Sequence, residues 1–326
     1  MTFDGANVYT GLLGTLGVRK ESTYGTWNSG GTTRCLGIPR KTMLTRIANV
    51  VPLGGIRDSR VPFGQKQLGY HYEGSIELEL QNALPLVMGM GVVSSTVAPA
   101  PYTHTITILR AATGGTASYL PSYTLCQIYQ GSSDVNVEAL GLTAKGLTVS
   151  CELGALAKAT IPFIAKDLGS DSIDAPTEET NDSYGSYNTK LLVDNSHATY
   201  TSGTECKGLK KIELSMDNAL EILGDFNQST IRQPVPGSLK SGLKTRVERR
   251  YVDGDFLAMV GDTEFSMQLQ FIRNAVSDYI YVTFNNCLIP SAGRTFDDAE
   301  PIANTPIDIN VSGITATATD ANSSYA

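Results

Sequence analysis

The stretch "KKIELSMDNALEILGDFNQS", residues 210–229, opens with an alternation that recurs along most of this chain. Polar and apolar residues alternate in the order Lys211, Ile212, Glu213, Leu214, Ser215 and Met216. A period of two residues is that of a β-strand with one buried face, not that of a helix. The alternation breaks at Asp217, and the polar residues that follow carry no catalytic motif. The stretch therefore predicts a half-buried strand with no chemistry of its own.

Similar alternation recurs elsewhere, between turns formed by Gly, Asn, Asp, Ser and Pro. The segments are 74–81, 102–109, 123–130, 145–153, 159–166, 264–272, 279–286 and 306–311. Two short segments have helical signals instead, because Asn82 can cap a helix with Pro85 in its first turn, and Asp253 can cap another. The sequence therefore predicts a mainly β protein with two short helices.

The order of these features repeats within the chain. Residues 42–91 can be laid over residues 212–261, so that strand, long polar arm, strand and short helix occur twice. Self-similarity of this kind indicates tandem copies of one unit. A chain of 326 residues is also longer than one core usually serves. We therefore expect two copies of one β-domain, each with one short helix.

The repeat divides the chain into five parts. They are an N-terminal arm (1–34), a first β-domain (35–170) with an insertion at 92–121, an acidic linker or surface loop (171–187), a second β-domain (188–313) and a C-terminal tail (314–326). The linker is rich in Ser and Thr and poor in apolar residues, which is typical of a segment outside a core.

Composition excludes several classes of function. Thirty-two acidic and 25 basic residues give a formal net charge of −7, which argues against a basic nucleic-acid binder. The N-terminus lacks a basic start followed by an apolar run, and the longest apolar stretch, residues 82–93, is too short to span a bilayer. The odd number of cysteines, without a C-x-x-C pair, argues against a disulfide framework or a structural zinc site. We expect a protein made in a cytoplasm, with buried free cysteines.

Candidates for catalysis are weak. Residues 237–245 are rich in glycine, but Leu243 interrupts the Gly-Lys-Ser/Thr order of a phosphate-binding loop. The three histidines, His71, His104 and His197, have no metal-ligand spacing. We therefore expect no cofactor, no metal and no enzymatic activity.

One carboxylate pair needs separate consideration. Glu77 and Glu79 share a strand face, and two carboxylates could serve glycoside hydrolysis. A solvated polar face explains them better, because the second copy has Glu248 and Arg250 at the corresponding positions.

Four segments in a fixed order carry a resemblance to a known family. They are "RKESTYGTW" (19–27), "PFGQKQLGYHYEGSIELELQNALPLVM" (62–88), "GLTVSCELGALAKATIPFIAKD" (146–167) and "GLKKIELSMDNALEILGDFNQSTIRQPVPGSLKSGLKTRVERRYVDGDFLAMV" (208–260). In combination they resemble the phage tail tube proteins, the major tail proteins of long-tailed bacteriophages. The insertion and the acidic linker depart from a simple member of that family.

The resemblance implies a β-sandwich or partial barrel for each copy, in a structural virion protein. Subunits would join edge to edge into rings that stack into a hollow tail tube, through which viral DNA passes to the host. Two copies in one chain imply a homotrimer ring with pseudo-sixfold symmetry. The implied partners are other copies of the chain, tape measure, tail terminator and distal tail proteins, and double-stranded DNA in transit. Assembly would take place in the host cytoplasm.

Two sets of site residues follow. The arms, residues 50–69 and 221–244, are too long for tight turns, so we expect them to reach a neighbouring ring. The candidates for that contact are Arg57, Asp58, Arg60 and Arg232. The candidates for the lining of the bore are Glu77, Glu79 and Glu248, because an acidic or neutral lining repels phosphate.

A second function remains open at this point, a glycan-binding β-sandwich module on a virion or cell surface. Such a module needs exposed aromatic side chains, and the single Trp27 with scattered tyrosines gives it little support.

Overall fold

The structure is a computed structural model, in which most of the chain is described. The described residues are 14–53, 64–96, 99–109, 119–129, 135–169, 176, 179, 181–224, 228–237, 239, 243–249, 264–290, 305–322 and 325. They form a mainly β protein, as expected, and every segment with the period of two overlaps a strand. The helix expected after Asp253 lies outside the described residues.

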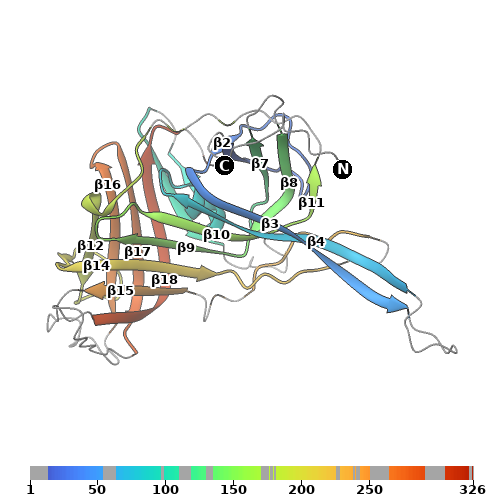
Figure 1. The fold of residues 1–326 in the computed structure, drawn as a ribbon. Helices are drawn as coiled ribbons and strands as arrows, with labels where there is room; N and C mark the ends of the chain where they lie inside the picture. The colour runs from blue at the N-terminus through green and yellow to red at the C-terminus, as the bar shows by residue number, and fades with distance from the viewer. Residues whose placement is uncertain are drawn as a thin grey trace.

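Eleven strands belong to the first half of the chain (Figure 1). They are β1 (Gly14–Lys20), β2 (Arg34–Cys35), β3 (Ile38–Leu53), β4 (Gly64–Glu79), β5 (Gly91–Ser95), β6 (Tyr102–Ile108), β7 (Tyr123–Tyr129), β8 (Val135–Ala144), β9 (Gly146–Glu152), β10 (Lys158–Ala165) and β11 (Asp167–Gly169). The second half contains β12 (Thr189–Asp194), β13 (Thr204–Glu205), β14 (Leu209–Asp217), β15 (Leu243–Arg249), β16 (Phe265–Asn274), β17 (Asp278–Leu288) and β18 (Thr305–Asp320).

The two halves share one order of strand partners. In the first half, hydrogen-bonded neighbours follow the order β2, β1, β7, β8, β10, β4, β3, all antiparallel. In the second half the order is β13, β12, β16, β17, β18, β15, β14. Without β5, β6, β9 and β11, each half contains seven strands. When the seven are numbered along the chain within each half, both halves have the same pairing order, 2-1-5-6-7-4-3. Copies of one unit would produce this correspondence.

Strand β14 contains the alternating residues 211–216. Its apolar residues Ile212, Leu214 and Met216 are buried, while Lys211, Glu213 and Ser215 between them are half-exposed. The prediction of a half-buried strand is therefore confirmed. The same alternation in β4 and β10 places Ile76 directly opposite Ile161 in the core.

The single α-helix among the described residues is α1 (Leu84–Met90), and all of its residues are buried. The sequence predicts Asn82 as its N-cap, whereas the N-cap residue is Ala83. Asn82 still satisfies a backbone group of the first turn, because its Oδ1 accepts the Leu84 N–H at 3.0 Å. Gly91 ends the helix with φ of 98°, a left-handed conformation that favours glycine. No helix of the described residues is long and apolar enough to cross a membrane.

A long hairpin of β3 and β4 projects from the rest of the molecule (Figure 1). The two strands pair from Ile38 with Glu79 to Leu53 with Gly64. The first arm, residues 50–69, is therefore strand at both ends and not a simple loop. Residues 54–63, between the two strands, lie outside the described residues.

Two strand pairings join the halves into one hydrogen-bonded network. β9 of the first half pairs with β14 of the second, from Gly146 with Asp217 to Glu152 with Lys211. β6, which lies in the 92–121 insertion, pairs with the C-terminal part of β18. The acidic linker also packs against the core, because Tyr184 is buried and its backbone bonds those of Leu80 and Ala157.

Candidate assembly surfaces

One long sheet edge is open. β14 hydrogen-bonds to β15 on one side and to β9 on the other. Its counterpart β3 pairs, within the described part of the chain, with β4 alone. The second edge of β3 therefore presents backbone N–H and C=O groups that another strand can pair. Among the described residues, the two corresponding edges therefore differ, because β9 covers that of β14 and no strand covers that of β3.

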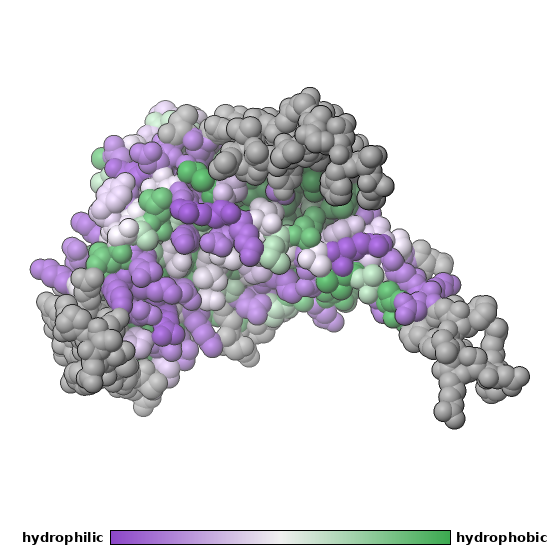
Figure 2. All heavy atoms as spheres, in the orientation of Figure 1, coloured by the Kyte–Doolittle hydropathy of each residue, from purple (hydrophilic) through white to green (hydrophobic). Residues whose placement is uncertain are grey.

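The projecting hairpin carries exposed apolar side chains (Figure 2). They are Met43, Ile47, Val50, Val51 and Leu68, the last of them 54 % exposed. Apolar groups gathered on one protruding element are unusual for a solvated surface and typical of a contact surface. We call these five residues the hairpin patch.

The second arm lies against the base of this hairpin. The Tyr70 N–H donates to the Ser229 carbonyl at 2.9 Å, and a groove of about 350 Å³ runs between the two segments. Ile47 and Leu68 of the hairpin patch line it from one side, and Ile222 and Ile231 from the other. Both arms of one chain therefore meet at the same place.

None of the four predicted arm contacts is tested by the structure of a single chain. Arg57, Asp58 and Arg60 lie outside the described residues. Arg232 is exposed in the second arm, where its backbone N–H donates to the Leu223 carbonyl at 2.9 Å.

A continuous polar face crosses the central strands. One row of directly opposite residues runs through β3, β4, β10, β9, β14, β15 and β18 and consists of Lys41, Glu77, Thr160, Thr148, Ser215, Lys244 and Asn310. Opposite residues in antiparallel strands share a face, and the core occupies the other face here. Figure 2 shows hydrophilic side chains over β9, β14 and β15. The sheet thus presents one polar surface built from both halves of the chain.

Charges on this polar face occur in both signs. The ion pairs are Lys211–Glu213 at 2.9 Å, Arg246–Glu248 at 3.4 Å and Lys145–Glu73 at 3.5 Å. Arg246 also lies 4.0 Å from Asp308 of β18. Acids and bases that alternate in this way cancel over short distances, so the face has little net field of its own.

The three predicted lining residues separate into two groups. Glu77 and Glu248 both lie on the polar face, on β4 and β15. Glu79 is only 6 % exposed, because it is ion-paired with Arg40 and accepts a hydrogen bond from Ser183 Oγ at 2.9 Å. Alternation places Glu79 on the face of Glu77, but its tertiary partners bury it.

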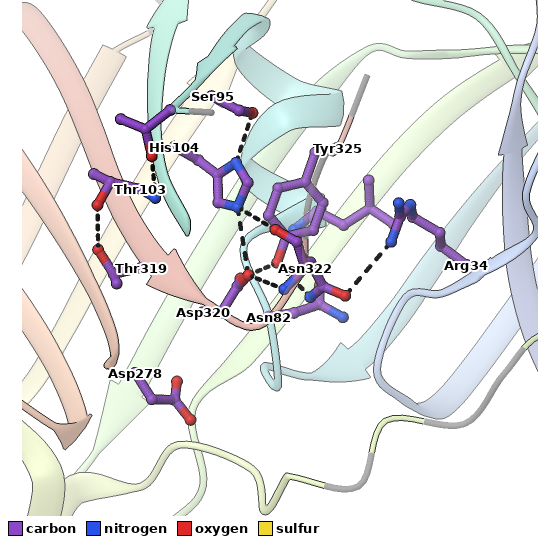
Figure 3. Close-up of polar contacts among 12 residues, drawn as sticks. Arg34, Asn82, Ser95, Thr103, His104, Asp278, Thr319, Asp320, Asn322 and Tyr325 are labelled. Carbon is purple, nitrogen blue, oxygen red and sulfur yellow. Dashed lines mark hydrogen bonds and ion pairs between the residues drawn. The ribbon is translucent and has the colours of Figure 1, made fainter. Parts of the chain in front are cut away.

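A buried polar cluster lies where β6 meets the C-terminal segment (Figure 3). His104 of β6 is 0 % exposed, with Nδ1 2.7 Å from Ser95 Oγ. Its Nε2 donates to the Asn322 carbonyl at 2.9 Å and lies 3.4 Å from Asp320 Oδ1. Tyr325, 3 % exposed, donates its hydroxyl hydrogen to Asp320, and its ring meets the His104 ring edge-on.

This cluster has the composition of a Ser-His-Asp triad but cannot act as one. A general base has to reach the substrate, and the imidazole of His104 is completely buried with both ring nitrogens bonded. The sequence shows only that His104 lacks metal-ligand spacing, which gives no indication of this cluster. The available signal was the closely spaced Asp320, Asn322 and Tyr325 near the end of the chain.

The cysteines, the possible metal ligands and Trp27 were further candidates for chemistry or binding. All five cysteines are free, and all but Cys35 are buried. No group of His, Cys, Asp and Glu among the described residues could hold a metal ion. Trp27 packs under the guanidinium of Arg19, 4.0 Å from the ring centre, and so is already engaged within the chain.

A family model described as phage tail tube protein matches residues 11–319, which is nearly the whole chain. A comparison with curated proteins gives no match.

Proposed function

Because this chain belongs to the phage tail tube protein family, we propose that it polymerises into the hollow tube through which viral DNA leaves the virion. Three chains form each ring, and each chain contributes two copies of one β-domain, residues 35–170 and 188–313. The copies are β-sandwiches or partial barrels, so the ring has pseudo-sixfold symmetry. Residues 171–187 act as linker, and the arm (1–34) and the tail (314–326) contribute β1 and the end of β18 to the sheets of the two copies.

The observation that carries this proposal is the difference between β14 and β3. Inside the chain, β9 of the first copy covers the edge of β14. The equivalent edge of β3 is uncovered in the described part of the chain and can be covered by the second copy of a neighbouring chain. Repetition of one head-to-tail contact closes a ring if the rotation fits. Three chains then supply six sheet junctions, three within chains and three between chains.

Contacts between rings are assigned to the arms. The hairpin patch exposes apolar surface on an element that projects beyond the sheet, and its burial against a second copy is favourable. Arg57, Asp58, Arg60 and Arg232 add charged groups to the same arms, and they make charge-assisted contacts at the rim of that interface.

The polar face is assigned to the bore. It is continuous across seven strands of both copies, so a ring of three chains carries it around a full circle. Glu77 and Glu248 line it, together with the ion pairs of β14, β15 and β18. A face with balanced charge does not gather phosphates as a basic one would, so DNA can slide. Glu79 lies on the same side of β4 but is covered by Arg40 and Ser183.

The remaining partners follow from the place of a tube in a tail. The tube ends contact terminator and distal tail proteins, and its interior holds the tape measure protein before DNA enters. Assembly takes place in the host cytoplasm, and the mature location is the virion tail.

Hydrogen exchange with mass spectrometry tests the ring contact directly. Amides of β14 should be protected both in isolated chains and in assembled tubes, because β9 covers them in each state. Amides on the open edge of β3 should exchange quickly in isolated chains and become protected on assembly. Electron microscopy of the same sample should show rings with three-fold symmetry and six density lobes.

Two results would overturn the proposal. Tubes in which β3 amides gain no protection would show that rings form through another surface. Rings that contain six chains would contradict the two-copy arrangement.

A further inference from the structure

The two kinds of junction in such a ring are not equivalent. Within one chain, the halves are joined by β9–β14 and also by β6–β18, from Tyr102 with Asp320 to Thr107 with Thr315. β6 belongs to the segment between β4 and β7, residues 80–122. The corresponding segment of the second half, residues 250–264, is less than half as long. The extra chain in the first half is the insertion that carries β5 and β6.

The β6–β18 contact is held in place by buried and half-buried side chains from both halves. The first half supplies Ser95 and His104, and the second half supplies Asp320. Thr103 Oγ1 and Thr319 Oγ1 add a direct cross-strand bond of 3.1 Å. Buried polar groups that are fully bonded are costly to separate, because each would lose its partner without gaining water.

The C-terminal residues Asn322 and Tyr325 make further contacts with other parts of the first half. Arg34 of β2 donates to Asn322 Oδ1 at 3.5 Å, and Asn322 Nδ2 donates to the Tyr325 hydroxyl at 3.1 Å. The same hydroxyl bonds the backbone of Ala83, next to α1. The end of the second half is therefore fixed to β2, β6 and the start of α1, all of which belong to the first half.

We propose that β6, together with Asp320, Asn322 and Tyr325, forms an intrachain clasp, which makes the junction within a chain stronger than the junction between neighbouring chains. This inference rests on the proposed function for its meaning in the ring. The second half has a much shorter segment at the place of the insertion, so the clasp occurs at every other junction of a six-domain ring. The ring therefore opens at three boundaries between chains, and the isolated chain keeps its two halves joined.

The clasp can be tested first in the isolated chain. Tyr325→Ala removes the aromatic anchor, and Asn322→Ala removes the bonds to Arg34 and Tyr325 but keeps the carbonyl that His104 uses. Tyr187→Ala, at a residue 80 % exposed, is the matched control. Exchange rates are measured for β9 and β14, with the β16–β17 hairpin as an internal reference.

Tyr325→Ala should raise exchange in β6, β9 and β14 by about tenfold or more relative to β16–β17, since one to two lost buried hydrogen bonds change an opening equilibrium by that factor. Asn322→Ala should act in the same direction with a smaller effect, and Tyr187→Ala should have none. Unchanged exchange in β9 and β14, or a uniform rise that includes β16–β17, would overturn the clasp. If Tyr325→Ala fails to fold, Asn322→Ala decides by the same criteria.

A second measurement addresses the ring. In assembled tubes treated with rising urea, β3 amides should lose protection at a lower concentration than β14 amides. Simultaneous loss, or earlier loss at β14, would contradict unequal junctions. If β3 amides are never protected in tubes, the proposed ring contact fails, while the isolated-chain result still decides whether the clasp exists.

Discussion

Gly74 is the residue where the smallest change should have a large effect. It lies in β4 where the backbone passes over Phe163, and a Cβ built there would be 2.1 Å from the Met43 carbonyl oxygen and 2.6 Å from Phe163 Cζ. The first of these atoms belongs to the backbone of β3, so the strand itself would have to shift. The packing of β3 against β4 therefore requires a residue without a Cβ at this position.

We expect Gly74→Ala to lower the free energy of unfolding by about 1–3 kcal/mol, the usual cost of overpacking a core. Urea unfolding of the isolated chain measures it. Gly224→Ala is the control, because a Cβ there meets nothing within 4 Å. Equal stability of the two variants would mean that β3 moves away from β4 without cost.

The carboxyl group of Asp320 predicts acid sensitivity of the clasp. Burial alone would raise the pKa of Asp320, but hydrogen bonds from His104, Tyr325 and the Asn322 backbone bring it below the usual value. A carboxyl whose pKa is lower in the folded state stabilises the fold above its unfolded pKa, about 3.9. That contribution is lost as the pH falls below this value.

Thermal unfolding between pH 6 and pH 2.5 should therefore show a smaller acid-induced drop in Tm for Asp320→Asn than for the unchanged protein. Asp308→Asn, at a carboxyl 72 % exposed, serves as the control and should keep the full drop. An identical pH profile for Asp320→Asn would show that the clasp does not depend on this charge.

At the scale of elements, the β3–β4 hairpin shows how a strand pair can serve assembly instead of the core. β4 is buried where β10 covers it, near Ile76 and Leu78, and becomes exposed where the hairpin projects, near Leu68. One continuous strand thus changes along its length from a buried core element to an exposed, projecting one.

The hairpin patch gives the prediction at this scale. Ile47→Lys combined with Leu68→Lys should leave the isolated chain folded with nearly unchanged Tm, because both side chains are largely exposed. Tube length should fall sharply, since two charges per chain would have to be buried between rings. Negative-stain electron microscopy measures the length distribution.

Val276→Lys is the matched control for this experiment. Val276 is 79 % exposed in the turn between β16 and β17, so the same change in chemistry occurs away from the hairpin. If the double variant forms tubes as long as those of the control, the hairpin patch does not contact a neighbouring ring.

At the scale of the whole molecule, the polar face predicts how charge affects the passage of DNA. In the proposed ring three chains carry Glu77 on this face, so Glu77→Lys would convert three acids to three bases in every ring. Basic side chains attract phosphates through counterion release, and salt weakens that attraction. We expect virions with Glu77→Lys to assemble normally and to eject DNA more slowly, most clearly at low salt.

Ejection rates measured over a range of ionic strengths test this expectation. Glu205→Lys makes the same charge change on β13, which lies at one end of the pairing order of the second half and is not part of the polar face. This variant should leave the ejection rate unchanged. A salt-independent rate for Glu77→Lys, equal to that of Glu205→Lys, would place the polar face outside the bore.

Much of the secondary structure could be predicted from the sequence, because alternation and capping are local. The period of two at Ile212, Leu214 and Met216 fixes both the strand and its buried face without knowledge of any partner. Asn82 and Pro85 mark the start of α1 to within one residue for the same reason. The repeat also predicted that β3 and β14 would have matching places in the strand order.

Only the tertiary structure decided which strands meet and which charged groups remain exposed. Alternation specifies a face but not a neighbour, so it could not show that β9 covers β14 while β3 stays open. It placed Glu77 and Glu79 together, and packing with Arg40 and Ser183 separated them. The contact of His104 with Asp320 and Tyr325 joins residues more than 200 positions apart, and such contacts depend on the global path of the chain, which no local pattern encodes.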